Sequence, residues 1–214
     1  MKSILSLTPG LALCAGLLLG AQAVSASTVE YHISLNTAAL IGNASAPFSL
    51  DFQLNDGSGL GDANNTAIVN DFVFGSGSAT GSANLFGGAT GNLSGAVTLT
   101  DSSAFNEFYQ TFNAGSTLSF DVTLTQNSDA GPRPDAFAFA ILDNSLNNLP
   151  TSGVGDTYLL VNLGPTPSVT TGSSTSPLAT ITVTPVPEPA SVVLIPLGLL
   201  AFILQRRNAA NLRG

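Results

Sequence analysis

The sequence contains very few of the residues on which many catalytic and metal sites depend. Of its 214 residues, one is cysteine, one is histidine, none is tryptophan and five are lysine or arginine. The single cysteine, Cys14, lies in an apolar N-terminal segment, so the region after it has no thiol. Disulfides, thiol catalysis and cysteine-bound metal are therefore excluded from that region, and one histidine cannot build a histidine-rich zinc site.

Basic side chains are almost confined to the two ends of the chain, because Arg133 is the only one between residues 27 and 186. Twelve acidic residues share that region with it, which leaves an excess of about eleven negative charges. Such a surface repels nucleic acid and anionic lipid head groups, so neither is predicted as a partner. It can attract divalent cations and keeps an exported protein soluble.

The N-terminus has the organisation of a secretory signal. Lys2 precedes the apolar run of residues 11–19, and small residues follow. We therefore predict a signal peptide at residues 1–26, used by the Sec translocon and cut by signal peptidase after Ala26, with Ala23 as the second choice. A buried helix is the less favoured interpretation, because such a helix would carry a polar face.

The C-terminal region, residues 185–214, has three consecutive parts. The first is a Pro-Glu-Pro motif at Pro187, Glu188 and Pro189, and the second is an apolar segment at residues 192–204. The third is a basic tail at residues 205–214, which contains Arg206, Arg207 and Arg213. Arginines after an apolar segment hold that end in the cytoplasm. The segment is shorter than the ~20 residues of a bilayer span. A temporary inner-membrane tether is therefore favoured over a permanent anchor with a proline-rich stalk.

This tripartite end resembles a PEP-CTERM sorting signal. The resemblance implies an exported protein of a Gram-negative bacterium, handled by exosortase, an integral-membrane cysteine transpeptidase-like enzyme. It further implies recognition near the Pro-Glu-Pro motif, removal of the tail and transfer to the outer surface or extracellular matrix. Residues 114–121 and 134–143 also resemble small uncharacterised PEP-CTERM proteins, which implies a shared β-sandwich and supplies no catalytic residues.

Residues 27–184 read as a series of short strands, because apolar and polar residues alternate along them. The predicted strands and apolar rows lie at residues 29–35, 48–54, 68–74, 93–99, 118–124, 137–141, 158–163 and 179–183. This pattern predicts an all-β, antiparallel sandwich, with a jelly-roll-like order favoured over an immunoglobulin-like one. We expect an N-terminal signal helix before the sandwich and a C-terminal transmembrane helix after it. The spacing of phenylalanines in residues 104–112 predicts a helical turn. The glycine-rich residues 75–95 predict a flexible loop or an edge hairpin.

Most polar residues of this region have an ordinary structural interpretation. His32 falls on the polar face of the first strand, so a surface histidine is expected. The aspartates fall at turns or at outward strand positions, which predicts solvated side chains; they include Asp51, Asp56, Asp62, Asp101 and Asp121. Two of the three tyrosines fit the buried rows.

The segment of residues 55–65 is the best candidate for a metal site. Asp56, Asp62 and Asn64 supply side-chain oxygens among glycines, and calcium binds six to eight oxygens of this kind. The spacing matches neither an EF-hand nor a nonapeptide repeat, so a plain turn-rich loop remains the alternative.

These observations predict a non-catalytic protein, a structural or adhesive component of an exopolysaccharide or biofilm matrix. A carbohydrate- or calcium-dependent binding module is the alternative. A secreted hydrolase is a remote alternative that would require two carboxyl groups facing each other across a cleft.

Overall fold

A computed structural model describes residues 28–58, 61–128, 131–164, 167–172 and 180–186. The predicted signal peptide with both cleavage positions, the Pro-Glu-Pro motif, the apolar segment and the basic tail lie outside these residues. Within the described part of the chain, no helix is long and apolar enough to cross a membrane.

The described residues form thirteen strands and two short 3-10 helices. In chain order they are β1 (Thr28–Asn36), η2 (Ala38–Leu40), β2 (Phe48–Asn55), β3 (Thr66–Val73), β4 (Ser78–Ala79), β5 (Asn84–Phe86), β6 (Gly88–Gly91), β7 (Val97–Thr100), β8 (Phe105–Asn113), β9 (Thr117–Thr125), β10 (Ala136–Leu142), η3 (Val154–Asp156), β11 (Leu159–Asn162), β12 (Ser168–Thr171) and β13 (Thr180–Val186). The prediction of an all-β protein is confirmed.

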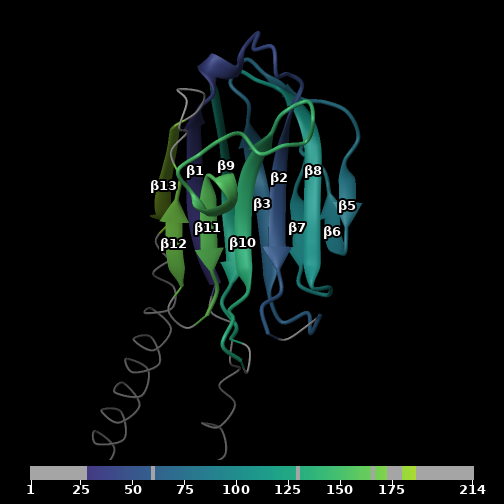
Figure 1. Ribbon diagram of the computed structural model, residues 1–214, viewed down its shortest axis with the longest axis vertical. Coiled ribbons are helices and arrows are strands. Elements are labelled where there is room, and N and C mark those ends of the chain that lie inside the picture. The colour runs from purple at the N-terminus through teal and green to yellow at the C-terminus, as the bar shows by residue number, and fades with distance from the viewer. Residues whose placement is uncertain (1–27, 59–60, 129–130, 165–166, 173–179, 187–214) are drawn as a thin grey trace, which may run out of the picture.

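The strands build two antiparallel sheets, which overlap as two layers in Figure 1. The first, sheet A, has the order β13-β1-β9-β3-β7-β6. The second, sheet B, has the order β12-β11-β10-β2-β8-β4, and β5 also pairs with β8. Strands that follow one another in sequence often lie in different sheets, so long-range contacts hold the fold together.

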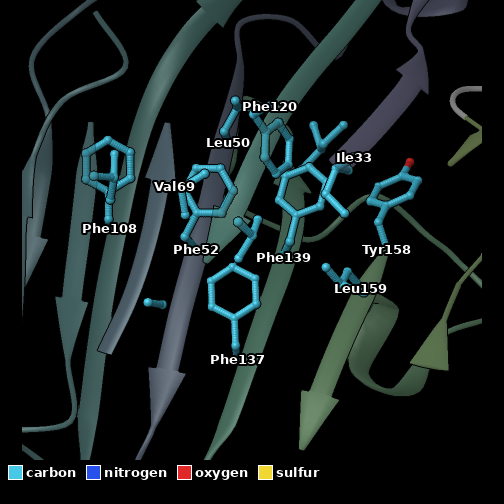
Figure 2. Close-up of a cluster of buried hydrophobic side chains, with 14 of the residues drawn as sticks. Ile33, Leu50, Phe52, Val69, Phe108, Phe120, Phe137, Phe139, Tyr158 and Leu159 are labelled. Carbon is cyan, nitrogen blue, oxygen red and sulfur yellow. The ribbon is translucent and has the colours of Figure 1, made fainter. Parts of the chain in front are cut away.

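Phenylalanines from both sheets form the centre of the shared core (Figure 2). The ring of Phe52 on β2 lies 5.3 Å from that of Phe120 on β9, and Phe120 lies 5.0 Å from Phe139 on β10. Both contacts cross from one sheet to the other in edge-to-face geometry, which is favourable for aromatic rings. The inward positions of β1, β2, β9 and β10 are the apolar residues that the alternation predicts.

The prediction of a helical turn at residues 104–112 is wrong, because these residues belong to β8. Two polar residues, Asn106 and Gln110, occupy inward positions of this strand and are buried. Asn106 accepts the backbone N–H of Gly88 at 2.8 Å, and Gln110 accepts that of Leu93 at 2.9 Å. The loop backbone therefore satisfies the buried amides, whose polarity hides the alternation in the sequence.

The apolar row predicted at residues 68–74 is wrong at its first member. Ile68 is 39% exposed, whereas its neighbours Ala67 and Val69 are buried. The register of β3 against β9 shifts between Asn70 and Val73, as in a β-bulge. Because a one-residue shift exchanges the two faces of a strand, Phe72 packs against the core although Ile68 faces outward.

The glycine-rich residues 75–95 contribute β4, β5 and β6 at the edges of the two sheets. β6 and β7 pair as an antiparallel hairpin at the edge of sheet A, which confirms the edge-hairpin alternative for that part. β5 and β6 follow each other closely yet pair with different sheets.

Candidate functional site

The loop that was predicted to bind calcium lies at the lower end of the molecule in Figure 1. Asp62 accepts the backbone N–H of Asn64 at 3.2 Å and its side-chain amide at 2.9 Å. Asp56 instead accepts the backbone N–H of Gly61. The structure thus brings Asp62 and Asn64 together and turns the Asp56 carboxylate to the loop backbone. Among the described residues, no group of three or more His, Cys, Asp or Glu side chains could hold a metal ion.

Beside this loop lies a polar cluster that is buried. Asn65 is its centre: its side-chain amide donates to Asp135 Oδ2 at 2.6 Å, and its side-chain oxygen accepts the Asn127 backbone N–H at 2.9 Å. Its own backbone N–H donates to Asp101 Oδ2 at 2.9 Å. Asn65 therefore donates hydrogen bonds to two carboxyl groups, those of Asp101 and Asp135.

The loop of residue 57 approaches this cluster closely. The backbone N–H of Gly57 donates to Asp135 Oδ1 at 2.7 Å. A Cβ atom at this position would collide with the carbonyl oxygens of Arg133 and Pro134. Glycine is therefore required at position 57, because only a residue without a side chain lets the two loops meet.

A second group of polar residues lies on the outer face of sheet B. Gln53 on β2 donates its side-chain amide to Asp51 Oδ2 at 2.8 Å and to Glu107 Oε1 on β8 at 3.4 Å. Asp51 is only 1% exposed although it alternates with the core residues of β2. Its Oδ1 atom is buried without a hydrogen-bond partner. The side-chain amide of Gln53 therefore bridges the carboxyl groups of Asp51 and Glu107.

Aromatic side chains adjoin this group. Tyr109 lies opposite Asp51 in the pairing of β2 with β8, and Phe86 on β5 lies opposite Glu107. The rings of Phe86 and Tyr109 are stacked, with centroids 6.3 Å apart and planes inclined by 20°. Phe86 is 50% exposed and Phe105, which precedes these positions on the same face of β8, is 46% exposed.

The electrostatic environment of these carboxyl groups is unusual. Burial, with a smaller contribution from the charge of Glu107, raises the pKa of Asp51 to about 7, against a lowering effect of the Gln53 hydrogen bond. Burial also raises the pKa of Glu107. For Asp101, burial and the contact with Asp135 raise the pKa. A carboxyl group that stays partly protonated near neutral pH can donate as well as accept hydrogen bonds.

The structure shows that the prediction of solvated side chains is wrong for Asp51 and Asp101. Asp51 is covered, and Asp101 has no exposed surface. Both positions look like ordinary polar positions of a strand or turn, so the sequence carries no signal that distinguishes them. His32 is exposed as predicted, and its Nδ1 lies 2.6 Å from Asp121 Oδ1 on the neighbouring strand. Tyr31 and Tyr158 are buried, as the alternation predicts, and Tyr109 is half-buried.

No family model matches the chain, and no curated protein or solved structure is detectably similar to it.

Proposed function

We propose that the protein is an exported component of the cell surface or extracellular polymer matrix, delivered by exosortase and acting without catalysis. The sequence of the two ends supports the delivery. The last described strand, β13, ends at Val186, immediately before Pro187 of the Pro-Glu-Pro motif. Recognition of that motif would therefore follow directly on the folded region.

Deletion of the host exosortase gene tests this route. We expect full-length protein, with its tail uncut, to accumulate in the inner-membrane fraction. A change of Glu188 to glutamine should have the same effect if the motif is recognised. Unchanged release and an unchanged mature mass in the deletion strain would contradict the proposal.

The outer face of sheet B is the surface that we propose to bind polysaccharide. The observation that carries this proposal is the stacked pair of Phe86 and Tyr109 beside Glu107 and Gln53. Aromatic faces pack against the C–H faces of sugar rings, while carboxylate and amide groups hydrogen-bond to hydroxyls. Both kinds of group meet on this face, and half of the Phe86 side chain is exposed.

Binding of the host exopolysaccharide to the purified chain tests the surface. Phe86→Ala and Tyr109→Ala should each weaken binding about tenfold, the effect of losing one central aromatic contact. Ile68→Ala is the matched control, because Ile68 is an exposed apolar residue of sheet A. Equal binding by all three variants would contradict the assignment of this face.

Binding is better supported than hydrolysis by the same residues. A glycosidase needs one carboxyl group on each side of the scissile bond, with both in contact with substrate. Asp51 is covered by protein, and Gln53 joins it to Glu107. Such an arrangement orients the Gln53 amide for recognition and leaves the half-buried Glu107 as the accessible carboxyl group of this cluster.

We further propose that the two sheets form a β-sandwich of jelly-roll-like order. The strand orders support it: sheet A contains β1-β9-β3-β7 as consecutive neighbours, and sheet B contains β2-β8-β4. In chain order, β1, β2 and β3 alternate between the sheets, and so do β7, β8, β9 and β10. This alternation is typical of the two Greek keys of a jelly roll. A crystal structure of the mature protein tests the assignment.

A further inference from the structure

The polysaccharide surface proposed on the outer face of sheet B carries acidic groups and no basic ones. Its strands β2, β8 and β5 pair in that order, and β5 lies at the right-hand edge of Figure 1. None of the three contains lysine, arginine or histidine. The basic side chains of the described residues are His32, on sheet A, and Arg133, in the loop before β10. The strands of this face therefore supply no cation for an acidic sugar.

Glu107 stands at the centre of this face. In the strand pairing it lies between Gln53 on β2 and Phe86 on β5, and Phe105 and Tyr109 flank it along β8. Opposite residues of antiparallel strands have Cβ atoms about 4.5–5.5 Å apart, and residues on the same face of one strand follow each other at about 7 Å. A sugar ring stacked on the aromatic pair therefore brings its substituents within reach of the Glu107 carboxyl group.

The polar atoms that remain available around Glu107 are hydrogen-bond acceptors. The Gln53 side-chain amide donates to Asp51 Oδ2 at 2.8 Å and to Glu107 Oε1 at 3.4 Å, which uses both of its N–H groups. Gln53 Oε1 and Glu107 Oε2 accept no hydrogen bond from the described residues, and neither oxygen is buried. This part of the face therefore binds a ligand that donates hydrogen bonds.

Charge determines which donor these oxygens favour. Hydroxyl groups and protonated amines can both donate to them, but only the amine carries a positive charge. Residues 27–186 contain twelve acidic residues and one arginine, so the field of the protein attracts cations and repels polymers that carry carboxylates or sulfates. Glu107 is half-buried, which reduces the screening of its charge by water. The faces of the Phe86 and Tyr109 rings also attract a cation.

We propose that the polysaccharide bound here is an amino-sugar polymer with free, protonated amines, an inference that rests on the binding function proposed above. One sugar ring stacks on the pair of Phe86 and Tyr109, and its ammonium group donates to Glu107 Oε2 and Gln53 Oε1. A charge-assisted hydrogen bond of this kind is stronger than a neutral one. N-acetylation of the sugar removes the charge and two of the three N–H donors.

Two oligosaccharides of equal length test the assignment, a chitosan oligosaccharide with free amines and its fully N-acetylated counterpart. Each is titrated calorimetrically into the purified full chain in detergent, slightly below neutral pH, where the sugar amines are protonated. The Kd for the chitosan oligosaccharide should be about fivefold lower than that for the acetylated one. The difference should shrink as the salt concentration rises, because salt screens the added attraction.

Two variants of equal charge locate the effect. Glu107→Gln should remove the preference for the free amines and change the Kd for the acetylated oligosaccharide by less than about twofold. Glu30→Gln is the matched control, because Glu30 is a half-buried glutamate on the outer face of sheet A, and this variant should keep the preference. Phe86→Ala should weaken the binding of both oligosaccharides, since both stack on its ring.

Equal affinity for the two oligosaccharides, or a preference that survives Glu107→Gln, would overturn the amino-sugar assignment and leave the binding function standing. Chemical N-acetylation of the host polysaccharide gives a measurement that needs no variant and no assumed linkage. It should weaken binding about fivefold or more, and unchanged binding would overturn the assignment. If neither the oligosaccharides nor the host polysaccharide bind in a manner that depends on Phe86, the proposed function fails together with this inference.

Discussion

Replacing Asp51 by asparagine should stabilise the protein at pH 8 and leave its stability at pH 4 nearly unchanged. In the folded protein the pKa of Asp51 is about 7, well above its ordinary value of 3.8. The folded state therefore holds this proton more tightly than the unfolded state does. The stability that the neutral carboxyl group contributes is present below about pH 4 and is lost as the pH rises through about 7.

The size of the effect follows from the two pKa values. At 1.36 kcal/mol per pH unit, the difference between them corresponds to about 4 kcal/mol. Water that reaches the group on local opening lowers this figure, so we expect Asp51→Asn to gain about 2–4 kcal/mol at pH 8. Asparagine keeps the shape of the neutral carboxyl group, and its side-chain oxygen can accept the Gln53 hydrogen bond.

Urea unfolding between pH 4 and pH 8, in EDTA, measures this difference. The free energy of unfolding of the wild type should fall across this range, and that of Asp51→Asn should fall less. Asp71→Asn, at an exposed position, should run parallel to the wild type. Parallel curves for Asp51→Asn and the wild type, or a variant that is less stable at pH 8, would refute the reasoning.

Three further changes test the packing and the buried polar cluster. Phe52→Ala should lower the free energy of unfolding, measured in urea, by about 3–5 kcal/mol, because Phe52 contacts five other aromatic rings. Phe105→Ala, at an exposed position, should lower it by less than about 1 kcal/mol. Similar losses in the two variants would contradict the assigned core. Asn65→Ala should cost about 2–4 kcal/mol, since it leaves buried partners unsatisfied, and a loss below about 0.5 kcal/mol would show that the cluster is not structural. Gly57→Ala should lower Tm measurably by separating the two loops, and an unchanged Tm would contradict their close approach.

The strands with a regular alternation were predictable from the sequence. In β1, β2 and β9 every second residue is apolar, and burial of one face against the other sheet requires this pattern. The pattern fails where another interaction replaces apolar burial. In β8, loop backbones satisfy the inward Asn106 and Gln110, and in β3 a bulge moves Ile68 to the outside.

The sequence by itself determined the all-β class, the deficiency of thiols and basic groups, and the composition of the two end segments. Only the tertiary structure decided which polar residues are buried. Asp51 and Asp101 read as solvated positions, since alternation and turn chemistry describe a residue's local neighbours. Segments distant in sequence bury these two side chains, and this burial raises their pKa values. It also places Asp101 and Asp135 together in the interior. Burial of a charge is a property of the assembled fold, so no local pattern records it.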